Sequence, residues 1–154
     1  MSTRSLAQTS FFDPRFADPH CLTAGTGSWV LATVGAELFP PWLATGWRGS
    51  GRRGRKAWPA PVLMGLLVLR WSEEGVSRLA SCDRLRVDIR WRAALGLRLG
   101  APTPSERTMR DFEGFLRERH PQVGTLRHVL VHEHIVRLCL DAGVAKGAQW
   151  AADS

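Results

Sequence analysis

The amino-acid sequence predicts an all-α protein: a small helical bundle with a helix-turn-helix-like core, an irregular N-terminal arm and a basic loop. Its 154 residues suit one domain, and 44% hydrophobic with 23% charged residues are enough for a folded core. Apolar side chains recur every three or four residues through most of the chain, which is typical of amphipathic helices. Capping residues precede these segments, and proline or glycine follows them, as at helix ends.

The first part of the chain predicts one helix between two irregular segments. Residues 1–23 are polar and interrupted by prolines, so we expect an irregular arm there. The first helix begins after Ser28 as N-cap and ends at the Pro40-Pro41 pair. The glycine- and arginine-rich run up to Trp58 cannot pack a core and predicts an exposed basic loop. The first helix and this loop together form the second predicted segment, 24–58.

The main helical domain is predicted over 59–143, with a buried helix at its centre. Residues 62–71 are apolar on every face, as expected of such a helix. A break at Gly75 and a Ser77 cap predict a short second helix through Cys82, and together these form the outline of a helix-turn-helix.

Residues 85–91 alternate between apolar and polar, which is also a strand pattern. Because Asp88 can cap a helix that runs to Gly96, we predict a helix here.

Two further helices complete the prediction. Thr103, Pro104 and Glu106 form a capping box, so a helix should begin at Pro104 with Thr103 as its N-cap. Its apolar stripe comprises Met109, Phe112, Phe115 and Leu116. The last helix extends from Leu126 to Leu140 and is ended by Gly143.

The net charge of +7 favours a polyanionic partner. Only Lys56 and Lys146 among the 21 basic residues are lysine, and arginine is the residue best suited to phosphate. No Asp or Glu occurs over 38–72, where six basic residues fall. The predicted DNA contacts are Arg48, Arg52, Arg53, Arg55, Lys56, Arg107, Arg110 and Arg117.

Other chemistries find little support in the sequence. There is no glycine-rich nucleotide motif and no GxSxG nucleophile. His128 and His132 lie one helical turn apart, but no second ligand cluster accompanies them, so we expect no metal. Three widely spaced cysteines predict neither a disulfide framework nor a zinc site.

The tryptophans divide into two groups. Trp71 and Trp91 lie in apolar helical patterns and should be buried. Trp47 and Trp58 flank the basic loop, so they are the two that we consider as contacts to nucleic acid.

Several motifs occur in an order that resembles a known family. A GR-rich loop precedes the apolar helix, Gly75-Val76-Ser77 forms a turn, DIRW at 88–91 leads into ALGL, and an SxxTxxxF pattern covers 105–112. This order resembles the N-terminal, InsH-type domain of bacterial insertion-sequence DDE transposases over about residues 11–154. The segment 79–82 departs from the family pattern, which carries charges there.

The resemblance implies a DNA-binding and assembly domain whose partner is double-stranded DNA, at the terminal inverted repeats of a mobile element. Asp153 resembles the first acid of the DDE triad, and 144–154 would be the start of a nuclease domain that is otherwise missing. The chain would then be a truncated product with no catalysis and no cofactor of its own, because Mg²⁺ belongs to a complete nuclease domain. Either the helix after Thr103 or the helix after Ser77 could contact base edges.

Two alternatives remain. The chain could be a regulatory fragment that pairs with itself or with full-length transposase, or it could be a decayed gene product. The longest apolar run, 62–69, is too short to span a membrane, for which about 20 residues are needed. We therefore expect no membrane partner and a cytoplasmic, nucleoid-associated protein.

Overall fold

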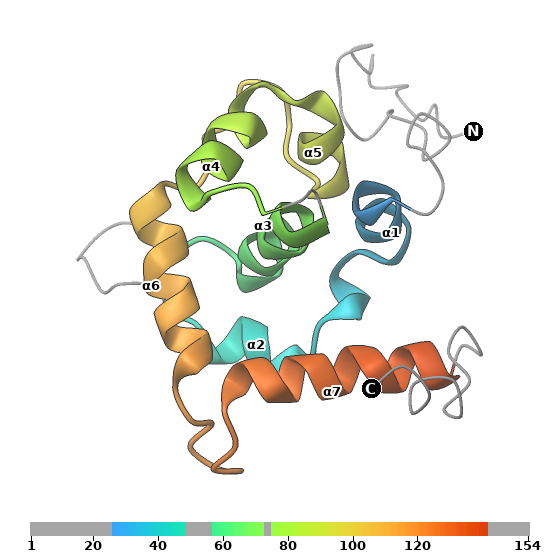
Figure 1. Ribbon diagram of the computed structural model, residues 1–154, viewed down its shortest axis with the longest axis vertical. Coiled ribbons are helices and arrows are strands. Elements are labelled where there is room, and N and C mark those ends of the chain that lie inside the picture. Colours follow the sequence, from blue (N-terminus) through green and yellow to red (C-terminus); the bar gives the residue numbers. More distant parts are fainter. Residues whose placement is uncertain (1–25, 49–56, 73–74, 142–154) are drawn as a thin grey trace, which may run out of the picture. The chain divides into compact units, whose positions relative to one another are not determined.

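The computed structural model describes residues 26–48, 57–72 and 75–141, and every regular element in these ranges is helical (Figure 1). The elements are α1 (Gly27–Val34), the 3-10 turn η3 (Gly35–Leu38), α2 (Pro41–Gly46), α3 (Ala60–Ser72), α4 (Arg78–Val87), α5 (Ile89–Ala94), α6 (Glu106–Arg117) and α7 (Arg127–Asp141). The all-α prediction is confirmed for this part of the chain. The predicted arm, most of the basic loop, and Gly143 lie outside the described residues.

The chain forms two compact units. Unit 1 comprises Met1–Gly35 and Gly65–Ser105, and unit 2 comprises Ala36–Met64 and Glu106–Ser154. No helix in the described ranges combines the length and the apolar character needed to cross a membrane.

Unit 1 is built around the C-terminal part of α3, with α1 packed on α5 and α4 packed on α5. Its core contains buried aliphatic side chains and the fully buried Trp91: Leu31, Leu66, Leu67, Leu69, Cys82, Leu85, Trp91 and Ala94. The helices approach closely at Gly65, where an added Cβ would collide with the side chain of Leu95. The buried central helix predicted from residues 62–71 is therefore confirmed for most of its length.

Trp71 contradicts the prediction that it is buried. Its side chain is 68% exposed, in the last turn of α3, and the Arg70 guanidinium lies 5.1 Å from its ring centroid. A run that is apolar on every face does not indicate which of its residues a neighbouring helix will cover.

Side-chain caps determine where α4 and α5 begin, as the sequence predicted. The Ser77 hydroxyl accepts a hydrogen bond from the Ala80 backbone N–H at 3.1 Å, and Asp88 accepts one from the Arg90 N–H at 2.9 Å. The segment around Asp88 is thus helical rather than a strand. α4 continues to Val87, beyond the predicted end at Cys82.

The first helix differs from its prediction at both ends. Thr26, not Ser28, is the N-cap, and its hydroxyl accepts from the Trp29 N–H at 3.3 Å. Serine and threonine both cap helices well, so residue type alone does not decide whether Thr26 or Ser28 is the N-cap. Gly35, with φ of 58°, ends α1 early. The proline pair then starts α2, with Pro41 at the first helical position. A backbone N–H at this position has no partner within the helix, so proline, which lacks the N–H, is well tolerated there.

Unit 2 contains α2, the first turn of α3, α6 and α7, with α6 packed on α7. The inward stripe of α6 is confirmed for Met109, Phe112 and Leu116, which are buried, whereas Phe115, the fourth predicted member, is half-buried. A short hairpin joins α6 to α7 through the isolated bridge between Arg119 and Leu126.

The predicted start of α6 is wrong by two residues, because the helix begins at Glu106 and Pro104 is a buried residue before it. Ser105, a residue type that also caps helices well, directly precedes α6.

Candidate nucleic-acid interface

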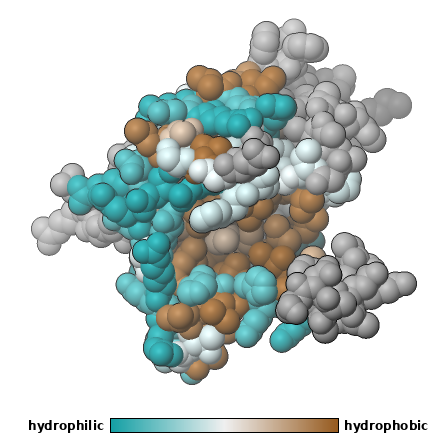
Figure 2. Space-filling view, in the orientation of Figure 1, coloured by the Kyte–Doolittle hydropathy of each residue, from teal (hydrophilic) through white to brown (hydrophobic). Residues whose placement is uncertain are grey.

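An arginine strip runs along the exposed side of α6, and we define it as Arg107, Arg110, Gly114 and Arg117. At 3.6 residues per turn these positions fall within an arc of about 80°. The strip lies on the side of the helix opposite to the buried stripe, and all four residues are exposed. Figure 2 shows hydrophilic side chains along α6, at the left of the view. The sequence therefore placed all three α6 arginines correctly on the surface.

Asp111 and Glu113 of α6 are less exposed than its arginines, whereas Glu106, at the start of the helix, is exposed. Arg107 Nε lies 4.0 Å from Asp111 Oδ2, with side chains 68% and 28% exposed. Arg117 Nη2 lies 4.0 Å from Glu113 Oε2, with side chains 77% and 15% exposed. Such long, solvated ion pairs contribute at most about 1 kcal/mol, so a phosphate could replace the carboxylate as partner.

Arg110 has no ion pair with any residue in the described ranges. An approaching polyanion therefore meets the guanidinium groups of the strip before it meets Asp111 or Glu113, while Glu106 is the exposed acid at the start of α6.

Trp47 attaches the start of the basic segment, residues 48–57, to α6. Its ring centroid lies 5.2 Å from that of Phe112 and 5.4 Å from that of Phe115. Its Nε1 donates a hydrogen bond to the carbonyl oxygen of Trp58 at 3.1 Å. We call this arrangement the tryptophan clasp. Because the clasp joins residues on either side of the segment, the segment begins and ends beside α6.

The clasp changes the interpretation of Trp47. We predicted it as a contact to nucleic acid, but its ring packs against α6 and is only partly exposed. Of the predicted basic contacts in the segment, Arg48 is described and is exposed. The others, Arg52, Arg53, Arg55 and Lys56, lie outside the described residues.

Two arginines, Arg92 and Arg127, contribute to the net positive charge, but their guanidinium groups bind other parts of the fold. The guanidinium of Arg92 is buried and donates to the backbone oxygens of Arg86, Arg98 and Ala101 at 2.7 to 3.2 Å.

Arg127 likewise donates to the Phe115 carbonyl oxygen at 2.9 Å and to Glu118 at 2.7 Å, and it lies 4.1 Å from the Phe115 ring centroid. No local sequence signal separates such arginines from exposed ones.

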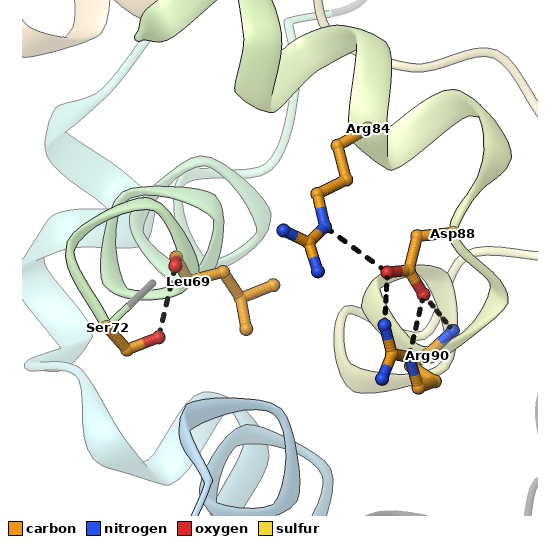
Figure 3. A network of polar contacts seen from close by, with 5 residues as sticks. All are labelled: Leu69, Ser72, Arg84, Asp88 and Arg90. Atoms are coloured by element: carbon orange, nitrogen blue, oxygen red, sulfur yellow. Dashed lines mark hydrogen bonds and ion pairs between the residues drawn. The ribbon is translucent and has the colours of Figure 1, made fainter. Parts of the chain in front are cut away.

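In unit 1, Asp88 joins α4 to α5 through a network of polar contacts (Figure 3). Its carboxylate accepts hydrogen bonds from Arg84 Nε at 3.3 Å and from Arg90 Nη2 at 3.0 Å, while it also caps α5. Burial would raise the pKa of Asp88, but the hydrogen bonds and charge of Arg90, with a hydrogen bond from Arg84, outweigh burial and hold the pKa below its usual value. The corner between the two helices is thus fixed by one ionised carboxylate.

The turn before α4 has the geometry that its sequence requires. Gly75 adopts φ of 72°, a left-handed conformation that suits glycine, and Ser77 then caps α4. α4 also exposes Leu79 and Val87, two apolar side chains, and Arg86. A helix, a glycine turn and a second helix with an exposed face are thus present in unit 1.

A metal-binding constellation is not found in the described part of the chain. Nδ1 of His128 lies 3.2 Å from the carbonyl oxygen of Leu116, so this imidazole ties α7 to α6. Cys82 and Cys139 are free thiols. Asp153, which we predicted as the first acid of a nuclease triad, lies outside the described residues.

Comparison with known proteins finds a family model that covers the basic segment and most of α6, ending before Arg117. No curated protein and no solved structure matches the chain. The family model described as Transposase domain (DUF772) matches residues 37–114, which span the clasp, α3 to α5 and most of α6. Because this match covers just over half of the sequence, the chain belongs to the DUF772 family of transposase domains.

Proposed function

We propose that this protein is a DNA-binding domain of a transposase, which binds the ends of a mobile element through the basic segment and the arginine strip. The observation that carries the proposal is the tryptophan clasp. It holds both ends of an acid-free, arginine-rich segment beside the helix that exposes Arg107, Arg110 and Arg117. Cations gathered in this way release counterions when they meet a phosphate backbone, which gives strong, salt-sensitive binding.

We further propose that α4 contacts base edges as the second helix of a helix-turn-helix. The glycine turn at Gly75 and the Ser77 cap support this role. The exposed side of α4 combines apolar Leu79 with charged Asp83 and Arg86. These are side-chain types that contact a thymine methyl group, a cytosine amino group and a guanine, respectively.

The experiment measures duplex binding by fluorescence anisotropy for two charge-matched double variants. The test variant carries Arg53→Ala and Arg55→Ala within the basic segment. The control variant carries Arg98→Ala and Arg137→Ala, which remove two exposed arginines that have no ion pair in the described structure. We expect the test variant to bind any duplex at least tenfold more weakly than the control variant, because it loses phosphate contacts.

Equal affinities for the two variants would contradict the proposal, since net charge alone would then account for binding. A wild-type protein that does not bind duplex DNA would contradict it outright.

We also propose that the chain binds DNA without cutting it. Nuclease chemistry of the DDE type needs several carboxylates that converge on two metal ions. Asp153 would supply a single carboxylate, which cannot hold two metal ions. The purified chain, with a labelled duplex and Mg²⁺ or Mn²⁺, should therefore leave the strands intact, and Asp153→Ala should change nothing. Metal-dependent nicking that Asp153→Ala abolishes would overturn this proposal.

A further inference from the structure

Gly114 is a glycine for which the fold gives no reason. It lies in the interior of α6 on the exposed side, its φ is not left-handed, and an added Cβ would meet no atom within 4 Å. Gly65 in α3 is the opposite case, because the side chain of Leu95 leaves no room for a Cβ there. Glycine in a helix interior lowers stability relative to alanine. Neither packing nor backbone geometry therefore explains glycine at 114.

Two arginines flank this glycine along the helix. Arg110 lies one turn before Gly114 and Arg117 lies one turn after it, so the two arginine Cα atoms are about 10.5 Å apart along the axis. Both arginine side chains are exposed. The missing side chain leaves a gap between them, and we call this gap the arginine-glycine notch.

Two acids lie near the notch, Glu113 and Glu118, and each is paired with an arginine: Glu118 is 68% exposed, but its carboxylate lies 2.7 Å from Arg127 Nη1. Glu113 precedes Gly114 in sequence, but its side chain is only 15% exposed and its carboxylate lies beside Arg117. A group that enters the notch therefore meets two guanidinium groups above an uncovered stretch of helix backbone. Guanidinium groups donate two parallel hydrogen bonds to a phosphate, which makes phosphate the anion that best fits this arrangement.

We propose that the arginine-glycine notch holds a phosphodiester group of the DNA backbone, with Arg110 and Arg117 as hydrogen-bond donors and Gly114 as the floor. This inference rests on the proposed function and assigns α6 to the sugar-phosphate backbone rather than to base edges. Glycine is required because any side chain at 114 would keep the backbone of the duplex away from the helix. Phosphate contacts carry no sequence information, so the notch contributes equally on every duplex.

The test fills the notch without removing a charge. Gly114→Leu places a bulky side chain between the two arginines, and Gly114→Ala adds a single methyl group. His132→Leu is the matched control, because His132 is an exposed residue of α7 in the same unit. Anisotropy titrations use duplexes of two unrelated sequences, and thermal unfolding shows that each variant is folded.

We expect Gly114→Leu to weaken binding at least tenfold, and by the same factor on both duplexes, while His132→Leu binds as wild type. Gly114→Ala should bind about threefold more weakly yet raise Tm by about 2–4 °C, because alanine favours the helix. Stability and affinity then change in opposite directions, which a purely structural role for Gly114 does not predict.

Three outcomes would overturn the inference. In the first, Gly114→Leu binds within twofold of wild type while the Arg53→Ala, Arg55→Ala variant loses affinity; this removes the notch but leaves the proposed function standing. In the second, His132→Leu loses as much affinity as Gly114→Leu, so the effect is not local. In the third, the wild type does not bind DNA, and both proposals fail together.

Discussion

Replacement of Asp88 separates two contributions that this one carboxylate makes to unit 1. It caps α5 by accepting from the Arg90 N–H at 2.9 Å, and it pairs with the guanidinium groups of Arg84 and Arg90 at 3.3 and 3.0 Å. Asp88→Ala removes the cap and both ion pairs. Asp88→Asn keeps a side-chain oxygen for the cap and removes only the charge.

The expected losses follow from these contacts. A lost N-cap costs about 1 kcal/mol. Each ion pair contributes up to about 1 kcal/mol, since Asp88 is only 11% exposed whereas the arginines are 34% and 60% exposed and partly screened by solvent. We therefore expect Asp88→Ala to lower the free energy of unfolding by about 2–3 kcal/mol and Asp88→Asn by about 1–2 kcal/mol.

Urea unfolding followed by circular dichroism at several pH values measures both effects. Because the folded pKa of Asp88 is below its unfolded value of about 3.9, its charge stabilises the fold above pH 4, and this contribution disappears as the pH falls through the folded pKa. The difference between wild type and Asp88→Asn should therefore shrink below pH 4. A difference that stays constant down to pH 2, or an Asp88→Ala variant as stable as wild type, would refute the assigned contacts.

Three further substitutions test contacts within one unit or the other. Gly65→Ala should destabilise the protein by about 1–3 kcal/mol in urea unfolding, because its Cβ would overlap Leu95; a stabilising effect would contradict the packing. Arg92→Met should lower the free energy of unfolding by about 2–4 kcal/mol, since three backbone oxygens lose their donor, and a change under 0.5 kcal/mol would show that they do not depend on it. Trp47→Phe keeps an aromatic ring against α6 but removes the hydrogen bond to Trp58, so anisotropy should show weaker DNA binding with little loss of Tm; unchanged affinity would count against the clasp.

The sequence predicted those features of the fold that depend on neighbouring residues. Ser77 and Asp88 cap α4 and α5 because a capping side chain bonds to a backbone N–H two or three residues away. The stripe of α6 was equally predictable, since Met109 and Phe112 recur at helical spacing. In each case, the interaction lies within one turn of the chain.

Features that depend on distant partners were not predictable. The exposure of Trp71 depends on which helix covers the end of α3, and the role of Trp47 depends on a carbonyl eleven residues away and on rings in α6. Arg127 is the same residue type as the arginines of the strip, yet its guanidinium donates a hydrogen bond to the backbone oxygen of Phe115, twelve residues earlier. Only the structure therefore distinguishes the arginines that stabilise the fold from those that face solvent at the candidate interface.

The salt dependence of duplex binding by the wild-type chain tests the central claim most directly. The arginine strip and the basic segment contain the cations Arg48, Arg52, Arg53, Arg55, Lys56, Arg107, Arg110 and Arg117. If all of them meet phosphates, the logarithm of the association constant falls with the logarithm of salt concentration with a slope near −7, at about −0.9 per contact. The account predicts a slope steeper than about −4 on any duplex; a slope shallower than about −2, or no measurable binding at low salt, would contradict it.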